Sequence, residues 1–222
     1  MATTAEVRRC TRLRGEPMRG RAAPERATMS RRRNERKESM HYLSHYESPL
    51  GAMTMASDGE HLTGLWFDGQ KYDRSTIDDD AVLQPRLPVF TQTAQWLDAY
   101  FEGADPGFTP PISIEGSDFR KMVTSIMLSI PFGATSTYAR IAAEVARRTG
   151  RKQMSAQAVG GAVGHNPITL IVPCHRVLAS DGSLRGYAGG VDRKERLLEM
   201  EGVNMSGLST PPAADDGGGR RE

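Results

Sequence analysis

The sequence predicts an α+β protein in which a small N-terminal antiparallel sheet with one helix precedes a mostly helical second domain. Short apolar segments alternate with turn residues between residues 41 and 67, and helical periodicity begins at residue 88. The charge also changes sign: residues 40–114 carry three basic and eleven acidic side chains, whereas residues 115–203 carry twelve basic and eight acidic ones. We therefore predict an N-terminal α/β domain at 40–110 and a second domain at 115–203, the better candidate for contact with an anionic partner such as DNA.

The two ends of the chain have the composition of disordered segments. Residues 1–39 contain eleven Arg and one Lys against five Glu and show no apolar periodicity, so we predict a disordered basic extension. Because Met29 and Met40 are alternative start positions, this extension is either a nucleic-acid-binding arm or inert sequence, and we favour the second. Residues 204–222 end in a glycine-rich stretch and are predicted to be a disordered tail.

Composition excludes several classes of protein. The chain has only two cysteines, Cys10 and Cys174, which cannot form a disulfide framework and indicate a reducing compartment. No apolar run reaches the ~18 residues of a membrane span, and the N-terminus lacks the apolar core of a secretion signal. We expect a cytoplasmic protein without a membrane partner.

The N-terminal domain is predicted to be a meander. Turn signals at Ser48-Pro49 and Asp58-Gly59 separate three candidate strands, and the polar, acidic segment 69–85 is expected to be loop. A helix over 88–102 follows, with Phe90 and Leu97 on its apolar face. The strands are expected at 41–47, 51–57 and 61–67.

The second domain is predicted to begin with a helix capped by Ser117 or Asp118 and stopped by Pro131-Phe132-Gly133. A helix over 136–148, ended by Thr149-Gly150, and a short helix over 154–163 follow. Two helices joined by a tight turn containing glycine are typical of a helix-turn-helix, although many small helical domains contain such a corner.

The short helix at 154–163 consists almost entirely of small residues. Its adjacent glycines, Gly160 and Gly161, cost about 2 kcal/mol of helix propensity relative to alanine. Two explanations remain open at this level. The helix packs closely in the core, or its slim face presses against a partner such as DNA.

The strongest chemical signal is Cys174-His175, which follows the apolar run 168–172. We expect that run to be a buried strand. Since neighbouring residues of a strand point to opposite faces, His175 would need a water relay or a sharp bend to act on Cys174. The alternative is a buried structural cysteine beside a surface histidine. The glycine-rich loop at 186–190, with its single aromatic Tyr187, is suited to closing over a flat ligand.

Several motifs in order resemble the catalytic domain of the O6-alkylguanine-DNA alkyltransferases, also called methylated-DNA–protein-cysteine methyltransferases. The resemblance covers residues 40–203, more weakly before 110, and implies a ribonuclease H-like N-terminal domain and a helix-turn-helix catalytic domain. The motifs are Pro131-Phe132-Gly133, Thr137-Tyr138, Ala158-Val159-Gly160-Gly161-Ala162, Asn166-Pro167, Pro173-Cys174-His175-Arg176-Val177, Gly186-Tyr187-Ala188-Gly189-Gly190, Lys194-Glu195, Leu197-Leu198 and Glu201-Gly202.

The resemblance implies a catalytic set. Cys174 matches the nucleophile that removes the alkyl group from O6 of guanine, and O4-alkylthymine is expected to be a second substrate. His175 matches the base that accepts the thiol proton through a water, and Glu201 matches the carboxylate that orients the histidine. Asn166 matches the asparagine that ties the helix-turn-helix to the segment carrying the nucleophile.

The same resemblance implies a DNA partner. Double-stranded DNA would bind through its minor groove with the alkylated guanine flipped into a pocket. Matching substrate-binding positions are Tyr138, Val177, Tyr187, Ala188 and Gly189, and matching DNA-binding positions are Gln157, Ala158, Gly160, Gly161 and Arg176. Gln157 is a departure, because many members carry an arginine there to fill the gap left by the flipped base.

Because a thioether product is chemically stable and no residue of the sequence suggests a way to cleave it, we predict one turnover per chain. We also expect a monomer that needs neither cofactor nor metal. Cys10 with scattered His41, His45 and His61 would make a poor zinc site. Three other classes of protein share some of these features. An alkyltransferase-like protein that only recognises damage would have lost the cysteine. A sequence-specific regulator would need more long polar side chains on its recognition helix. A cysteine hydrolase would turn over without DNA.

Overall fold

The computed structural model describes residues 40–77 and 80–210. The predicted extension at 1–39, with Cys10, lies outside the described residues, as does the end of the chain from 211 to 222. Within the described part of the chain, no helix has the length and apolar character needed to cross a membrane.

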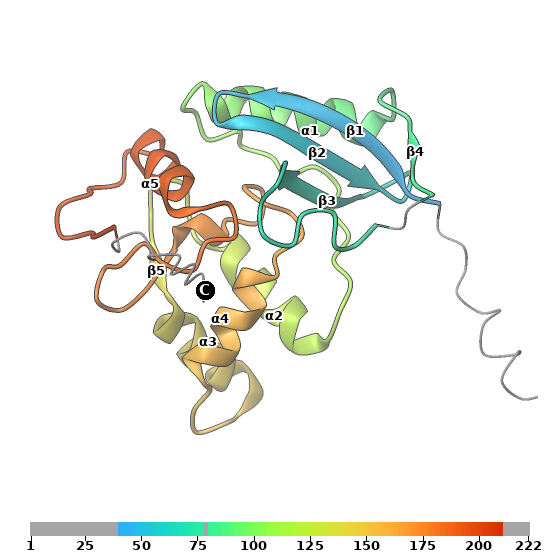
Figure 1. Ribbon diagram of the computed structural model, residues 1–222. Helices are drawn as coiled ribbons and strands as arrows, with labels where there is room; N and C mark the ends of the chain where they lie inside the picture. Colours follow the sequence, from blue (N-terminus) through green and yellow to red (C-terminus); the bar gives the residue numbers. More distant parts are fainter. Residues whose placement is uncertain (1–39, 78–79, 211–222) are drawn as a thin grey trace, which may run out of the picture. The chain divides into compact units, whose positions relative to one another are not determined.

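The N-terminal sheet is built on the predicted meander. β1 (Tyr42–Ser48), β2 (Gly51–Ser57) and β3 (Leu62–Phe67) are antiparallel neighbours, and a bulge shifts the β2–β3 register between Ala56 and Ser57 (Figure 1). A fourth strand, β4 (Val82–Leu83), pairs in parallel with β1 and gives the order β3-β2-β1-β4. The prediction of loop throughout 69–85 was therefore wrong at β4, because two exposed residues show no alternation of apolar and polar side chains.

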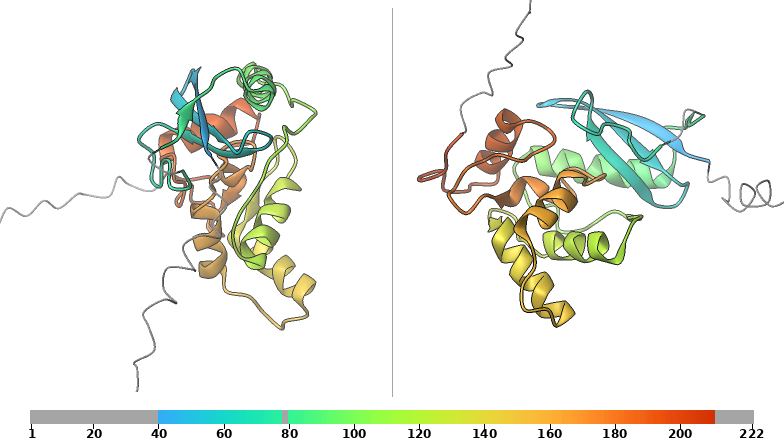
Figure 2. Two further views of the ribbon diagram at one scale, coloured as in Figure 1. Left: turned by 90° about the vertical axis from the view of Figure 1, so that its right-hand side faces the viewer. Right: turned by 60° about the horizontal axis from the view of Figure 1, so that its bottom comes forward.

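Helix α1 (Pro88–Phe101) covers one face of this sheet (Figures 1 and 2). Proline stands in its first turn, where no intrahelical hydrogen bond is lost. Phe90, Leu97 and Tyr100 are buried to 1 % exposure or less, and burying such a side chain contributes roughly 1.5–3 kcal/mol. The helix thereby fixes Tyr100, its penultimate residue, in the interior.

The first helix of the second domain is capped by Ser117, one of the two residues predicted to do so, and the next two helices begin with caps that were not predicted. Ser117, Thr137 and Ser155 each accept a hydrogen bond from the backbone of the first turn that follows. Gly150 ends the second helix in the left-handed region at φ 67°. The three helices are α2 (Asp118–Leu128), α3 (Tyr138–Thr149) and α4 (Ala156–Gly164), and α3 with α4 forms the helix-turn-helix.

A short parallel pair and a last helix complete the domain. β5 (Ser136–Thr137) pairs with β6 (Val177–Leu178), and α5 (Val191–Met200) had no counterpart among the predicted elements. Residues 204–210, predicted as tail, also make contacts: Ser209 bridges to Ser183, and Leu208 packs on the small apolar cluster of Leu178, Leu184 and Leu198. The predicted disorder is wrong for these residues, because Leu208 has an apolar surface to cover.

The apolar run at 168–172 is buried but is not a strand. Ile168 forms one bridge with Leu65 of β3, and the chain then turns through Leu170 at φ 71°. Cys174–Arg176 is a 3-10 turn. A short apolar run is compatible with any buried conformation, which is why the sequence pattern misled. Backbone bonds of Leu65 with Pro167 (2.8 Å) and Thr169 (2.9 Å) hold this segment on the N-terminal sheet.

Candidate active site

Cys174 begins the 3-10 turn and is only 5 % exposed. The Asn166 side-chain amide lies 3.0 Å from its Sγ and also donates to the carbonyl of Val172 at 2.9 Å. The Asn166 Oδ1 accepts a bond from the backbone N–H of Ile168 at 3.1 Å. One side chain just after α4 therefore holds both the turn and the sulfur.

Two opposing influences act on the Cys174 thiol. Burial raises its pKa above the ordinary value, while the Asn166 hydrogen bond and the positive charge of Lys194 lower it. Lys194 is fully buried, its Nζ donates to the carbonyl of Val177 at 2.6 Å, and burial lowers its pKa to about 8. The net effect is a raised pKa, so the resting cysteine is a thiol that needs a base before it can act as a nucleophile.

His175 is the base that the structure offers. Its ring is fully buried, and its Nε2 lies 2.7 Å from Oε1 of Glu201. Burial lowers its pKa despite the neighbouring carboxylate, so the ring is neutral at pH 7. Since an ionised carboxylate only accepts, Nε2 carries the proton, and Nδ1 has no hydrogen-bond partner in the described part of the chain. A neutral imidazole with a free basic nitrogen results.

The 3-10 turn changes the expected relation between Cys174 and His175. The argument from opposite faces of a strand does not apply, because the two residues lie on a tight turn. The turn is a sharp bend, which is one of the two arrangements expected to allow His175 to act on Cys174; the other was a water relay. Among the described residues, the sulfur has its hydrogen bond from Asn166 and the imidazole has its bond to Glu201.

Glu201 stands at the end of α5, where the helix dipole disfavours a negative charge. Its Oε2 accepts from the Arg176 Nε at 2.8 Å and from the backbone N–H of Gly133 at 3.1 Å. Its Oε1 accepts from Tyr100 Oη at 2.8 Å, from His175, and from Arg176 at 3.0 Å. Although burial opposes it, the hydrogen bond from His175 and the hydrogen bonds and charge of Arg176 lower the pKa of Glu201 to about 2.

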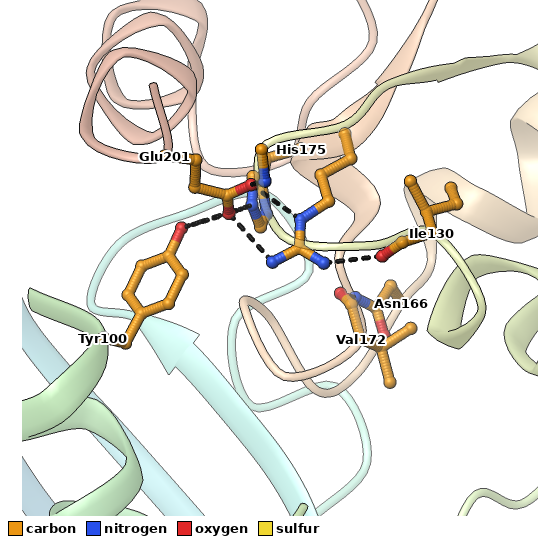
Figure 3. A network of polar contacts seen from close by, with 8 residues as sticks. Tyr100, Ile130, Asn166, Val172, His175 and Glu201 are labelled. Atoms are coloured by element: carbon orange, nitrogen blue, oxygen red, sulfur yellow. Dashed lines mark hydrogen bonds and ion pairs between the residues drawn. The ribbon is translucent and has the colours of Figure 1, made fainter. Parts of the chain in front are cut away.

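Arg176 was expected to contact DNA, and the structure contradicts this. The residue is 8 % exposed, and its third nitrogen donates to the carbonyl of Ile130 at 2.7 Å. Its guanidinium also lies over the ring of Phe132. A buried arginine whose nitrogens all have internal partners neutralises Glu201 and is not available to a phosphate (Figure 3).

The loop at 186–190 lies over this centre. The Tyr187 ring is 8 % exposed and meets the His175 ring edge to face at 6.4 Å, while its Oη has no partner among the described residues. The carbonyls of Ala188 and Gly189 accept bonds from the Lys71 backbone at 3.2 Å and from Arg193 at 3.0 Å. A Cβ at Gly189 would come within 2.6 Å of the Tyr187 ring, so a larger residue there must displace this tyrosine.

Tyr138 and Val177 border the same loop and turn. Val177 is fully buried in β6 directly after the turn. Tyr138 starts α3, and its Oη lies 3.4 Å from the carbonyls of both Arg185 and Gly186. Burial, followed by the nearby Cys174, raises the pKa of Tyr138 to about 12, so the phenol remains a hydrogen-bond donor at any physiological pH.

The outer face of α4 carries almost no side-chain bulk. Gln157, Ala158 and Gly161 are exposed and Gly160 is half-buried. A Cβ at Gly161 would meet no described atom within 4 Å, and one at Gly160 would make only an ordinary contact with Tyr138 at 3.9 Å. Close packing in the core therefore does not explain these glycines.

Basic residues flank this face. Arg151 and Lys152 are exposed in the turn between α3 and α4. They are missing from the predicted site because basic residues in a polar turn carry no motif of their own.

Two family models match the chain in succession. The ribonuclease-like domain of 6-O-methylguanine DNA methyltransferase matches residues 41–114, and the DNA binding domain of the same enzymes matches residues 118–203. A methylated-DNA–protein-cysteine methyltransferase from Mycobacterium tuberculosis is 39% identical over 162 residues, which are 73% of this chain and 92% of that protein. The chain belongs to the methylated-DNA–protein-cysteine methyltransferase family.

Further relatives agree. The methylated-DNA–protein-cysteine methyltransferase of Methanosarcina barkeri is 39% identical over 74% of this chain and 99% of its own. A crystal structure of Mycobacterium tuberculosis O6-methylguanine methyltransferase aligns with a TM-score of 0.63 at 38% identity, over 77% of this chain and 96% of that chain. A structure of the Mycobacterium tuberculosis protein in complex with DNA aligns at 0.62 and 37% identity, over 75% and 94%. The predicted family and fold class are confirmed.

Three members of the centre had no predicted role. Tyr100 was not singled out within the predicted helix at 88–102, Lys194 was assigned only to a matching motif, and Gly133 only to a helix stop. A Cβ at position 133 would lie 2.9 Å from the carbonyl of Glu201, and Gly133 has a φ of 74°. The Pro-Phe-Gly motif together with a distant glutamate is the one sequence signal that could have indicated this contact.

Proposed function

We propose that Cys174 accepts the alkyl group from O6-alkylguanine in duplex DNA, and that each chain does so once. The observation that carries the proposal is the pairing of a protonated cysteine, held by Asn166, with a neutral histidine whose free Nδ1 and carboxylate-bound Nε2 make it a base. Family membership supplies the substrate class. DNA repair by direct alkyl transfer is the function that these features support together.

The reaction requires no group beyond those of protein, substrate and water. The thiol proton of Cys174 passes through a water to Nδ1 of His175, and the thiolate attacks the alkyl carbon in line with the C–O bond. A new S–C bond forms as the C–O bond breaks, and its electron pair leaves on O6. Guanine recovers a proton at N1, so the thiol proton finally replaces the alkyl group on the base.

The protein stabilises both the attacking group and the leaving group in the transition state. Glu201 favours the imidazolium that forms when His175 accepts the proton. Lys194, buried behind the turn, favours the thiolate electrostatically. Tyr138, a phenol of raised pKa, is placed to donate to the departing base. None of the residues around Cys174 offers a way to cleave a thioether, and the chain is consumed.

DNA is proposed to bind through its minor groove at the bare face of α4, with the damaged nucleotide flipped toward Cys174. The absence of side-chain bulk at Gly160 and Gly161 permits close approach of the helix backbone. Gln157, exposed near the start of α4, occupies the gap left in the duplex. The protein acts as a monomer, and O4-alkylthymine is a second substrate of the same pocket.

A stoichiometry experiment tests this proposal. Excess duplex containing O6-methylguanine is incubated with wild type, with Cys174→Ser and with Cys10→Ser, and restored guanine is counted per protein chain. We expect one guanine per chain for wild type and Cys10→Ser and none for Cys174→Ser. Turnover well above one overturns the consumed-acceptor mechanism. Tight binding of damaged duplex without transfer would favour a protein that only recognises damage.

A further inference from the structure

Tyr100 belongs to the N-terminal domain, yet its hydroxyl lies within the catalytic centre of the second domain. It is the thirteenth residue of α1 (Pro88–Phe101), which packs on the sheet. Its Oη is 2.8 Å from Oε1 of Glu201 and 3.3 Å from Nε2 of His175 (Figure 3). These partners follow it by 101 and 75 residues in the chain.

The direction of these hydrogen bonds is determined by charge. Burial, followed by the charge of Glu201, raises the pKa of Tyr100 well above its ordinary value, so the phenol keeps its proton. The Glu201 carboxylate is ionised and only accepts. Tyr100 therefore donates to Oε1 of Glu201, and Nε2 of His175 donates its proton to the same oxygen. This arrangement leaves Nδ1 as the only basic nitrogen of the ring.

The position of the Tyr100 ring is fixed independently of its hydroxyl. The ring stacks on Trp96 at 5.1 Å and 9°, and it meets Phe132 edge to face at 6.0 Å. The residue is 1 % exposed. Trp96 is itself held by a bond from its Nε1 to the carbonyl of Phe108 at 2.9 Å. A ring held this firmly delivers its hydroxyl to one place.

We propose that Tyr100 is a positioning residue for alkyl transfer, through which the N-terminal domain orients the Glu201–His175 pair. The inference rests on the proposed function, since it assigns a residue to that reaction. It gives the N-terminal domain a direct part in the chemistry. Besides His175, two side chains donate hydrogen bonds to the Glu201 carboxylate: Tyr100 from α1 and Arg176 from the catalytic turn.

The test compares two matched tyrosines of the same domain. Tyr100→Phe keeps the ring contacts and removes only the hydroxyl, whereas Tyr46→Phe removes a similar bond to a carboxylate, from Tyr46 Oη to Asp98 at 2.8 Å, outside the centre. Methyl transfer is measured under single-turnover conditions with excess protein between pH 5 and 9. We expect the Tyr100→Phe rate constant to fall by about tenfold, the effect of one hydrogen bond to a charged group, and Tyr46→Phe to react like wild type.

A second readout separates positioning from simple loss of stability. Without the Tyr100 donor, Glu201 attracts the proton on His175 more strongly, so the pKa of His175 should rise and the acid limb of the rate profile should move to higher pH by roughly half a unit to one unit. Nitrogen NMR of labelled histidine reports the same titration in the free protein, without DNA. A slower Tyr100→Phe with an unshifted limb and an unshifted His175 titration would overturn the proposal.

A double mutant gives the final control. In a Glu201→Gln background the partner of Tyr100 has lost its charge, and we expect Tyr100→Phe to cost no further rate. A full additional tenfold loss there would place the effect of Tyr100 elsewhere. If wild type itself transfers no methyl group, the proposed function fails, whereas wild-type transfer with an unaffected Tyr100→Phe rejects only the role of Tyr100.

Discussion

The catalytic turn and the helix before it are constructed in opposite ways, although Asn166 joins them directly. Around Glu201, five donors converge on one buried carboxylate. On the outer face of α4, a Cβ at Gly161 would point into open space. The buried centre is costly to alter because removing one partner leaves a charge unpaired. The glycines on the exposed helix face add no stability to the free protein, so we attribute them to a partner that binds this face.

The largest effect is expected from Glu201→Gln. The neutral amide cannot favour the imidazolium of His175, and the rate constant for methyl transfer should fall by about 10²–10⁴-fold, the usual contribution of general base catalysis. Glu199→Gln, an exposed position on the same helix, is the control and should react like wild type. A Glu201→Gln protein with more than half of the wild-type rate would contradict the relay.

Arg176→Met tests the reassignment of that residue from the DNA surface to the buried centre. Removing one partner of a buried ion pair typically costs 3–5 kcal/mol of unfolding free energy, measurable by chemical denaturation. Arg196→Met, at an exposed position of α5, should change stability by less than about 0.5 kcal/mol. A weaker affinity for undamaged duplex with unchanged stability would restore the original prediction of a DNA contact.

Acid should destabilise the protein through the same centre. The folded-state pKa of Glu201 is about 2, below the value of 4.5 expected when unfolded, so its contribution is complete above pH 4.5 and is lost as pH falls through 2. The lowered pKa of His175 acts in the same direction as pH falls below 6.5. Denaturation series should show the stability difference between wild type and Glu201→Gln shrinking from pH 5 to pH 2, and a constant difference would contradict this assignment.

Gly161→Ala should affect stability and DNA affinity in opposite directions, unlike the substitutions in the buried centre. The new methyl group has open space in the free protein, and replacing a helical glycine should raise the unfolding free energy by up to about 1 kcal/mol. In the proposed complex the same methyl group would stand between the helix backbone and the minor groove, so affinity for duplex DNA should fall about three- to tenfold. Greater stability with unchanged affinity would remove α4 from the interface.

The smallest effect concerns Gln157. Gln157→Arg adds one positive charge at an exposed position of α4, so the slope of log affinity against log salt should steepen by about 0.9 if the new side chain meets a phosphate. Binding titrations at several salt concentrations measure the slope. Identical slopes for the two proteins would count against a position close to the DNA backbone.

The local structure was largely predictable where side chains alternate or caps are present. The strands of the meander and the helices begun by Ser117, Thr137 and Ser155 follow from their own residues. The turn at 168–176 was not predictable in this way, because its apolar residues are buried in any conformation and its geometry comes from Asn166 and from the edge of β3.

The catalytic centre was only partly predictable for a related reason. Cys174 and His175 are adjacent and form a motif. Tyr100 has partners 75 and 101 residues away, and an aromatic residue on an amphipathic helix looks like any core residue. The resemblance assigned Arg176 to the DNA surface, whereas its role in neutralising a glutamate at a helix end becomes visible only when α5 is placed against the turn.

The identity of the alkyl acceptor tests the whole account most directly. The protein is incubated with duplex DNA containing O6-methylguanine, digested, and its cysteine peptides are examined by mass spectrometry. We predict one methyl group on Cys174, none on Cys10, and a sharply reduced yield at early times in Glu201→Gln. An unmodified Cys174 in a sample whose guanine has been restored would contradict the central claim.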